Sequence, residues 1–200
     1  MKGLITGADG FIGSAMMRYL TPNKLHDAIG MVRPKKNFSP EPPLEFRFFD
    51  LLCAENDRPN LKDIDVVVHT AAMVHRTNSF PKKVLDGFMK MNCNATLNLA
   101  EHAAKAGVKR FIFLSSIKVN GEKADLNKPF RYDDPKIGDD PYGKSKSKAE
   151  IGLLKIASNT NLEVTIIRPP LVYGPGVKAN FSTLLKFASR NIPLPLGSIN

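Results

Sequence analysis

The sequence has few of the features that mark secreted, metal-binding or membrane proteins. It contains only two cysteines, Cys53 and Cys93, which lie far apart without CxxC or paired-histidine spacing. We interpret them as buried thiols in a reducing cytoplasm and expect neither a disulfide nor a metal site. No hydrophobic run is long enough to cross a membrane, and the chain enters a strand at once, so we expect no membrane contact and no signal peptide.

Clusters of basic and aromatic residues are also missing, although positive charge is abundant. The formal net charge is +10 at pH 7, while 42% apolar and 24% charged residues are ordinary for a globular protein. Such a charge attracts nucleic acid or an anionic small ligand, and it also serves solubility alone. Because the Lys and Arg residues are scattered, we favour an anionic ligand and expect no nucleic-acid partner.

A glycine-rich turn near the N-terminus organises the chain. The stretch TGADGFIG, residues 6–13, follows an apolar run and precedes apolar residues at helical spacing. Gly7 permits a tight turn, Gly10 permits close approach of a pyrophosphate, and Gly13 permits close packing of helix against strand. The helix N-terminus adds unpaired N–H groups for the anion. Three glycines also fit an ordinary turn, but their place at the first strand-to-helix turn indicates a dinucleotide site.

Strand and helix patterns alternate along the rest of the chain. Strands are expected at 27–33, about 44–49, 64–69, 111–114 and 163–168, and helices at 82–106, 141–158 and 180–190. This order predicts an α/β fold, a Rossmann-type doubly wound parallel sheet with right-handed crossovers. We expect a dinucleotide-binding domain at 1–175 and the start of a truncated substrate-binding subdomain at 176–200. Ligands of such sheets bind at the carboxyl ends of the strands.

The end of the second predicted strand carries no acidic residue, although this position faces the adenosine ribose in the fold. Arg33 and further cations at 35–36 stand there instead. An arginine suits a ribose 2′-phosphate, whereas an acid would accept hydrogen bonds from a 2′-hydroxyl. The pattern therefore favours NADP(H) over NAD, and a solvated basic loop is the alternative.

Polar and small residues follow the next two strands. We expect Asp50 and Leu51 either to bracket an adenine ring or, as the alternative, Asp50 to cap the next short helix. Ala71 and Ala72 are small where the backbone could pass close to a cofactor. We leave His69 out of the site, because a histidine at a strand end more often makes structural hydrogen bonds.

A tyrosine and a lysine stand four residues apart where the 141–158 helix begins. On a helix, Tyr142 and Lys146 share one face. A tyrosine titrates near pH 10, and a neighbouring ammonium lowers that pKa toward the range of a general base. Ser116, at a strand end, could hydrogen-bond the substrate oxygen. A solvated helix face is the alternative, and Asn92 likewise has either a polar role or a solvent-facing side chain.

Together these motifs resemble the extended short-chain dehydrogenase/reductases, in the NAD-dependent epimerase/dehydratase family that acts on nucleotide sugars. The resemblance covers essentially the whole chain through 6–13, 50–51, 69–72, 115–116, 142–146 and 168–176. It implies that Tyr142 is the acid/base, that Lys146 orients the nicotinamide ribose, and that Ser116 polarises the C4 oxygen. The implied cofactor contacts are Gly7, Gly10, Phe11, Ile12, Gly13, Arg33, Asp50, Leu51, Ala71, Ala72, Asn92, Tyr142, Lys146 and Pro169. The implied substrate contacts are Ser116, Tyr142 and Asn180.

The resemblance implies hydride transfer at C4 of a UDP-sugar, and a UDP-hexose 4-epimerase is the expected activity. The alternatives are an NADP(H)-dependent 4-ketoreductase of surface-polysaccharide synthesis and a non-catalytic module that senses NADP(H). Lys118 and Asn120 stand where epimerases usually carry a small hydroxyl residue and a tyrosine, so we expect a different sugar pocket.

The resemblance also bears on assembly and completeness. Members of the family pair through two helices in a four-helix bundle, so we expect a cytoplasmic homodimer formed by 82–106 and 142–158. The family runs to roughly 300 residues or more, as fits a two-part enzyme. Because this chain stops at Asn200, where the sugar-binding part would begin, we expect it to be a fragment.

Overall fold

The structure is a computed structural model of the chain, and it divides the chain into two compact units, Met1–Pro170 and Leu171–Asn200. The residues it describes are 1–20, 27–35, 44–53, 57–74, 81–124, 127–135, 138, 140–177 and 179–189. The predicted division at 175/176 falls slightly further along the chain. In the second unit the structure describes one helix, α5 (Ala179–Ser189).

The first unit alternates strands and helices. Its strands are β1 (Lys2–Thr6), β2 (Asp27–Val32), β3 (Glu45–Phe48), β4 (Val66–His69), β5 (Arg110–Leu114) and β6 (Glu163–Ile167). Its helices are α1 (Phe11–Leu20), α2 (Pro81–Phe88), α3 (Ala95–Lys105) and α4 (Pro141–Asn159), with a π-helix at Met89–Asn94 and a 3₁₀ turn at Ile117–Val119. None of the helices in the described part of the chain has the length and apolarity that a membrane crossing needs.

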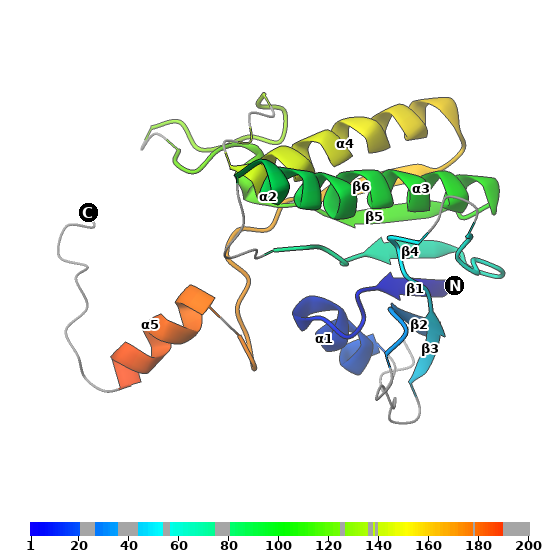
Figure 1. Cartoon of the computed structure of the whole chain (residues 1–200), viewed down its shortest axis with the longest axis horizontal. Helices are drawn as coiled ribbons and strands as arrows, with labels where there is room; N and C mark the ends of the chain where they lie inside the picture. The colour runs from blue at the N-terminus through cyan, green and yellow to red at the C-terminus, as the bar shows by residue number, and fades with distance from the viewer. Residues whose placement is uncertain are drawn as a thin grey trace. The chain divides into compact units, whose positions relative to one another are not determined.

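All six strands form one parallel sheet, in the order β3-β2-β1-β4-β5-β6 (Figure 1). The predicted Rossmann-type fold is therefore confirmed. The strand order reverses direction between β1 and β4, where Thr6 is paired with His69. Ligands of such sheets bind outside the carboxyl ends of the strands at this switch point.

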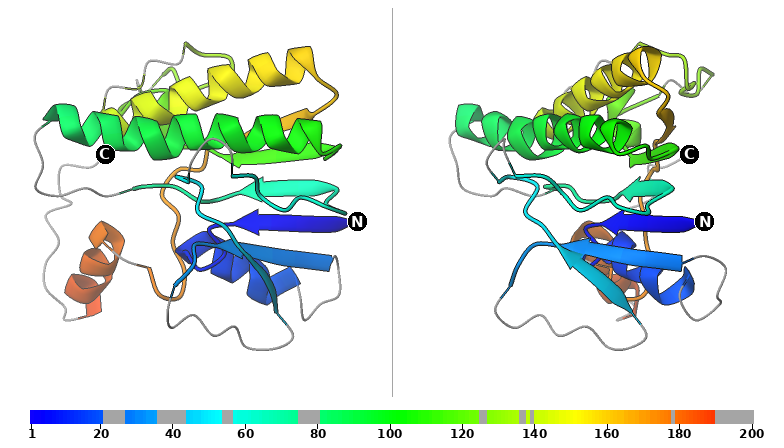
Figure 2. Two further views of the ribbon diagram at one scale, coloured as in Figure 1. Left: turned by 45° about the vertical axis from the view of Figure 1, so that its right-hand side comes forward. Right: turned by 90° about the vertical axis from the view of Figure 1, so that its right-hand side faces the viewer.

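Both faces of the sheet are covered at its central strands, so β1 and β4 contain continuous apolar runs, whereas the edge strands β3 and β6 are partly exposed. Leu4 faces a core that includes Leu99 of α3 and Leu153 of α4, whereas the next residue, Ile5, faces a second core with Met17 of α1. Figure 2 shows α3 and α4 running side by side.

Two predicted boundaries differ from the structure for local reasons. The strand predicted from residue 64 begins at Val66, because Ile64 N–H bonds the carbonyl of Leu61 and Asp63 takes a positive φ of 61°. The single helix predicted at 82–106 consists of α2, the π-helix and α3 in succession. A π-helix is rare and occurs mostly as a single turn inside an α-helix, so the apolar stripe of the whole segment predicts one continuous α-helix.

Candidate active site

The glycine turn lies against the start of the segment after β4. Gly7 has a φ of +64°, and a Cβ there would lie 2.8 Å from the Cα of Ala71. A Cβ on Gly13 would collide with the carbonyl of Gly7. α1 begins inside the turn, since Ser14 N–H bonds the Gly10 carbonyl at 2.9 Å. These contacts explain why residues 7 and 13 are glycines, and the turn leads directly into the first N–H groups of α1.

The residues predicted to face the adenosine lie at the carboxyl ends of β2 and β3. Arg33 is exposed, and Lys35 pairs with Asp9 of the glycine turn. Asp50 accepts the N–H of Leu52 at 2.9 Å and so caps a turn at 51–53, where the alternative expected the start of a short helix. Leu51 packs against the core. Adenine contact by Asp50 and Leu51 stays a prediction.

A chain of buried polar side chains crosses the protein beneath the switch point. Thr6 Oγ1 contacts His69 Nδ1 at 2.7 Å, His69 Nε2 contacts Thr96 Oγ1 at 2.9 Å, and Thr96 Oγ1 donates to the carbonyl of Asn92 at 2.9 Å. Burial, helped by the nearby charge of Lys146, lowers the pKa of His69 to about 3, so its imidazole is neutral. The expected structural hydrogen bonds of His69 are confirmed.

Asn92 lies in the π-helix and is fully buried, so its solvent-facing alternative is wrong. Its side chain accepts Met73 N–H at 2.8 Å and donates to the Met73 carbonyl at 2.9 Å. It also donates to Ser145 Oγ at 3.1 Å, and Ser145 in turn donates to the carbonyl of Tyr142 at 2.7 Å. Asn92 thus joins the segment after β4 to the first turn of α4. Its predicted contact with a cofactor is not tested by these bonds.

α4 carries Tyr142 and Lys146 on one face, as the spacing predicts. Asp140 caps the helix by accepting Gly143 N–H at 2.9 Å. The Lys146 ammonium is buried, donates to the Leu114 carbonyl at 2.8 Å, and lies 5.9 Å from the centre of the Tyr142 ring. Burial lowers the pKa of Lys146 to about 7, against the opposing charge of Glu150.

Ser116 stands between two residues that contact α4. Leu114, at the end of β5, accepts the Lys146 ammonium, and Lys118 pairs with Asp140 at 2.9 Å. The Ser116 hydroxyl accepts Lys118 N–H at 3.3 Å, and the next amide, Ile117 N–H, bonds the carbonyl of Pro169 at 3.1 Å. The structure therefore brings the strand end at Ser116 beside the turn of α4 that holds the tyrosine and the lysine.

The expected lowering of the Tyr142 pKa is wrong for the protein as the structure has it. Burial raises the pKa of this phenol, the negative charge of Asp140 adds to the rise, and Lys118 opposes it. The physical reason is first the burial of the phenol and then the Asp140 carboxylate two residues before it, while the Lys146 ammonium is directed to the Leu114 carbonyl.

Sequence reasoning missed a buried ion pair behind the site. Glu150, one turn beyond Lys146 on α4, binds Arg168 after β6 and the hydroxyl of Ser115. Its position four residues after Lys146, which itself lies four residues after Tyr142, was the available signal.

The remaining predicted residues are placed as follows. Cys93 is buried, whereas Cys53 is only half-buried, so the expectation of two buried thiols holds for one of them. Asn180 falls within α5, but its side chain lies outside the described residues. Across the described ranges, no three His, Cys, Asp or Glu side chains gather as a metal site would require.

A glycine turn lies at the switch point of the parallel sheet, and a Tyr–Lys pair lies beside a strand-end serine. Together they define the class, a Rossmann-type α/β protein built like the extended short-chain dehydrogenase/reductases. The family model described as the NAD dependent epimerase/dehydratase family matches residues 3–193, and the chain belongs to this family.

Known proteins similar to the chain agree with this assignment. UDP-glucose 4-epimerase of Vibrio cholerae is 42% identical over 196 residues, covering 98% of this chain and 59% of the relative. The structure of UDP-glucuronic acid 4-epimerase from Bacillus cereus with NAD superposes with a TM-score of 0.77 at 28% identity, covering 97% of this chain and 65% of that one. MoeE5 in complex with UDP-glucose and NAD gives a TM-score of 0.75 at 30% identity, covering 97% and 63%. The chain thus spans less than two thirds of the length of these relatives.

Proposed function

We propose that this chain is the dinucleotide-binding part of a UDP-sugar 4-epimerase, with a UDP-hexose as substrate. The observation that carries the proposal is the placement of Tyr142 and Lys146 on one helix face beside the strand end at Ser116, at the carboxyl edge of the sheet. The similarity to the Vibrio cholerae UDP-glucose 4-epimerase and to structures bound to UDP-sugars supports the same reaction.

The residues around the switch point fit a dinucleotide. Gly7 and Gly13 leave no room for a Cβ because the turn packs closely against Ala71 and the start of α1, and Gly10 would present backbone without a side chain to a pyrophosphate. The first-turn N–H groups of Phe11, Ile12 and Gly13 would hold the phosphates, with the positive end of the helix dipole behind them. Ala71 and Ala72 would flank the dinucleotide, and Pro169 would lie near its nicotinamide end. When bound, the nicotinamide supplies the hydride acceptor and donor.

The protein's own groups would handle the proton. The phenol of Tyr142 would exchange a proton with the sugar O4, and Ser116 would hold that oxygen by a hydrogen bond. Lys146 would support the phenolate electrostatically and hold the ribose hydroxyls of the dinucleotide. Because the pKa of Tyr142 is raised by burial and by Asp140, the positive charge on Lys146 is essential to this proton transfer.

Incubation of the full-length protein with UDP-glucose or UDP-N-acetylglucosamine, without added cofactor, tests the proposal. An epimerase returns the hydride to the sugar, so the 4-epimer should form with no net change in nicotinamide absorbance. Absence of any 4-epimer from all UDP-hexoses offered would contradict the proposal.

The exposed Arg33 favours a second candidate, an NADP(H)-dependent 4-ketoreductase of a UDP-4-keto-6-deoxy sugar in surface-polysaccharide synthesis. Such an enzyme releases the oxidised dinucleotide after each turnover. Stoichiometric consumption of NADPH with a 4-keto sugar, together with tighter binding of NADP(H) than of NAD(H), would select this candidate over the epimerase.

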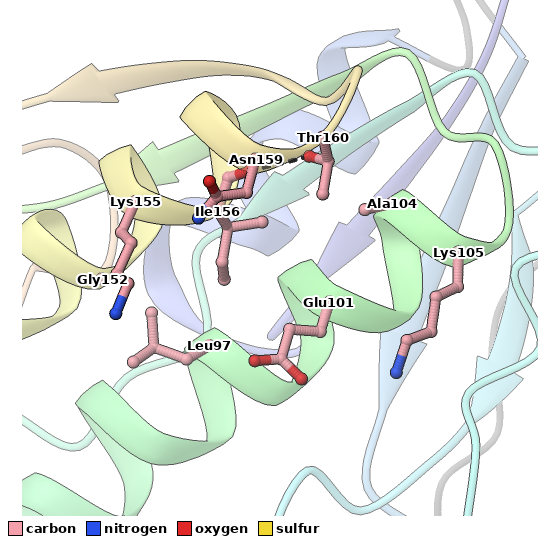
Figure 3. A pocket seen from close by; sticks show the side chains of 9 residues that line it. All are labelled: Leu97, Glu101, Ala104, Lys105, Gly152, Lys155, Ile156, Asn159 and Thr160. Carbon is pink, nitrogen blue, oxygen red and sulfur yellow. Dashed lines mark hydrogen bonds between the residues drawn. The ribbon is translucent and has the colours of Figure 1, made fainter.

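We further infer that the full protein is a cytoplasmic homodimer that pairs through α3 and α4. A groove of about 490 Å³ lies between these helices, and its lining includes Leu97, Gly152 and Ile156. Figure 3 shows Leu97 of α3 pointing toward α4 and Ile156 of α4 pointing toward α3. Beside the groove, Ile151 and Leu154 are 56% and 48% exposed. Apolar side chains at this exposure on one helix suit burial against the same face of a second copy.

A further inference from the structure

The buried carboxylate of Glu150 lies at the centre of a polar network behind the candidate active site. Its side chain is 0% exposed, and that of its partner Arg168 is 13% exposed. Arg168 donates through Nε to Oε1 at 3.0 Å and through Nη2 to Oε2 at 2.7 Å, a two-point contact. The Ser115 hydroxyl donates to the same Oε1.

The network continues from Arg168 to the surface loop after β5. Arg168 Nη1 donates to Asn120 Oδ1 at 3.0 Å and to the carbonyl of Tyr132 at 3.2 Å. Asn120 Nδ2 in turn donates to the Arg131 carbonyl at 3.0 Å. The Asn120 amide therefore links the arginine to the loop.

A buried ion pair contributes little net stability, because removing the two charges from water costs much of the free energy that their attraction provides. Apolar residues of similar size often stabilise as much. It does fix geometry, because each charged atom must keep its partner. Ser115 precedes Ser116 directly, and its N–H also bonds the Ile167 carbonyl at 2.8 Å. The residue before the proposed O4 ligand is thus held from α4 and from β6 at once.

We propose that Glu150 is a positioning residue for the reaction proposed above, on which this inference rests. Its carboxylate binds the Ser115 hydroxyl and so fixes the position of the neighbouring Ser116 relative to α4. Through Arg168, the same carboxylate also connects the surface loop at residues 131–132 to α4. It also supplies negative charge one helical turn from Lys146, keeping that lysine protonated where its charge is needed.

The groups that surround Lys146 make it possible to test whether Glu150 keeps this lysine protonated. On its own helix the lysine faces Tyr142 and Glu150, and from β4 it faces His69, whose burial keeps it neutral. From β5 it faces the Leu114 carbonyl and the Phe113 ring. The negative charge of Glu150 raises the pKa of Lys146 against the effect of burial. Without that charge Lys146 loses its proton at lower pH.

The experiment compares Glu150→Gln with wild type in the full-length protein, acting on UDP-glucose across a range of pH. We expect kcat to fall by about tenfold or more with KM nearly unchanged, because a small displacement of Ser116 affects the transition state more than binding. The alkaline limb of the kcat profile should move to lower pH. A merely structural role would lower kcat equally at every pH.

A second readout does not need turnover. In the 200-residue chain with ¹³C-labelled lysines, the Lys146 signal, assigned by its loss in Lys146→Arg, should titrate at lower pH in Glu150→Gln than in wild type. An unchanged Lys146 titration, or wild-type kcat and pH profile in Glu150→Gln, would overturn the inference. Wild-type protein that is inactive on every UDP-sugar would instead refute the proposed function, while the titration would still report on Glu150.

Two further variants complete the test. Glu163→Gln is the matched control, because Glu163 also pairs with an arginine, Arg110, but with side chains 63% and 52% exposed on the surface. It should leave kcat and the pH profile unchanged. If Glu150→Gln does not fold, Ser115→Ala takes its place, since it keeps the ion pair and removes only the hydroxyl. A lower kcat in Ser115→Ala supports the inference, and an unchanged one overturns it.

Discussion

At the residue scale, the candidate site buries a lysine side chain in surroundings that disfavour its charged form. Lys146 is 1% exposed and has one carbonyl acceptor at 2.8 Å, with the Phe113 ring 4.5 Å away. Burial lowers its pKa from 10.5 to about 7. Between these values the unfolded chain binds more protons than the folded one, so this residue makes stability rise with pH over that range.

Lys146→Met should therefore separate stability from activity. We expect it to abolish turnover and to stabilise the fold by about 1–3 kcal/mol at pH 6, where wild type carries a buried charge. The gain should shrink as pH rises from about 7 toward 10, because the folded wild-type lysine is then neutral. Urea unfolding at pH 6 and pH 9 measures the difference. An equal effect at both pH values would refute the buried charge.

His69 affects stability at acidic pH, whereas Lys146 affects it at neutral to alkaline pH. Its pKa is lowered from 6.5 to about 3 by burial, with Lys146 adding to the effect. The unfolded chain binds the extra proton below pH 6.5, so the stability that neutral His69 permits is lost as pH falls from 6.5 toward 3. The melting temperature of wild type should drop over this interval.

His69→Gln is the variant to compare, because its amide can still bond one of the two threonine partners of the imidazole. It should be less stable than wild type at pH 7, by about 1–3 kcal/mol for the broken buried hydrogen bonds. Its stability should depend less on pH between 6.5 and 4. A parallel pH dependence in both proteins would show that other groups control acid unfolding.

At the scale of elements, sequence pattern located the strands because buried β-branched and aromatic runs leave little choice of structure. It also placed Tyr142 and Lys146 on one helix face, since helical spacing alone decides that. It could not show that Tyr142 is buried or where the Lys146 ammonium points, and so it gave the wrong direction for the Tyr142 pKa. It missed the Glu150–Arg168 pair because that pair joins segments distant in the chain. It missed the π-helix because the apolar pattern of a long helix does not distinguish a single π turn from the α-helix around it.

The β1–α1 turn gives a prediction at this scale with a built-in control. Gly7 and Gly107 both have positive φ, +64° and +77°, but a Cβ on Gly7 would meet Ala71 whereas one on Gly107 meets nothing within 4 Å. Gly107→Ala should cost only the backbone strain, about 1 kcal/mol, and leave dinucleotide binding intact. Gly7→Ala should lose measurable NAD binding in calorimetry. Equal effects of the two substitutions would mean that close approach to Ala71 is unimportant.

At the scale of the whole molecule, α4 divides its surface between two tasks. Its buried face includes Lys146 and Glu150, and its exposed face includes Ile151 and Leu154. Because the two faces belong to one helix, pairing through the exposed face would hold the helix that positions the tyrosine. Formation of the proposed dimer should therefore affect the position of Tyr142 in the candidate active site as well as the molecular mass.

Ile151→Glu combined with Leu154→Glu tests the dimer. Burying two carboxylates against a symmetry mate is unfavourable, so light scattering should show a dimeric mass for wild type and a monomeric mass for the double variant. Phe48→Glu is the matched control, since Phe48 is 53% exposed on the edge strand β3 and should leave the mass unchanged. A monomeric wild type, or a double variant that stays dimeric, would exclude α4 as the interface. If the dimer holds α4 in place, the double variant should also bind NAD more weakly than Phe48→Glu, because its Tyr142–Lys146 turn loses the support of the second copy.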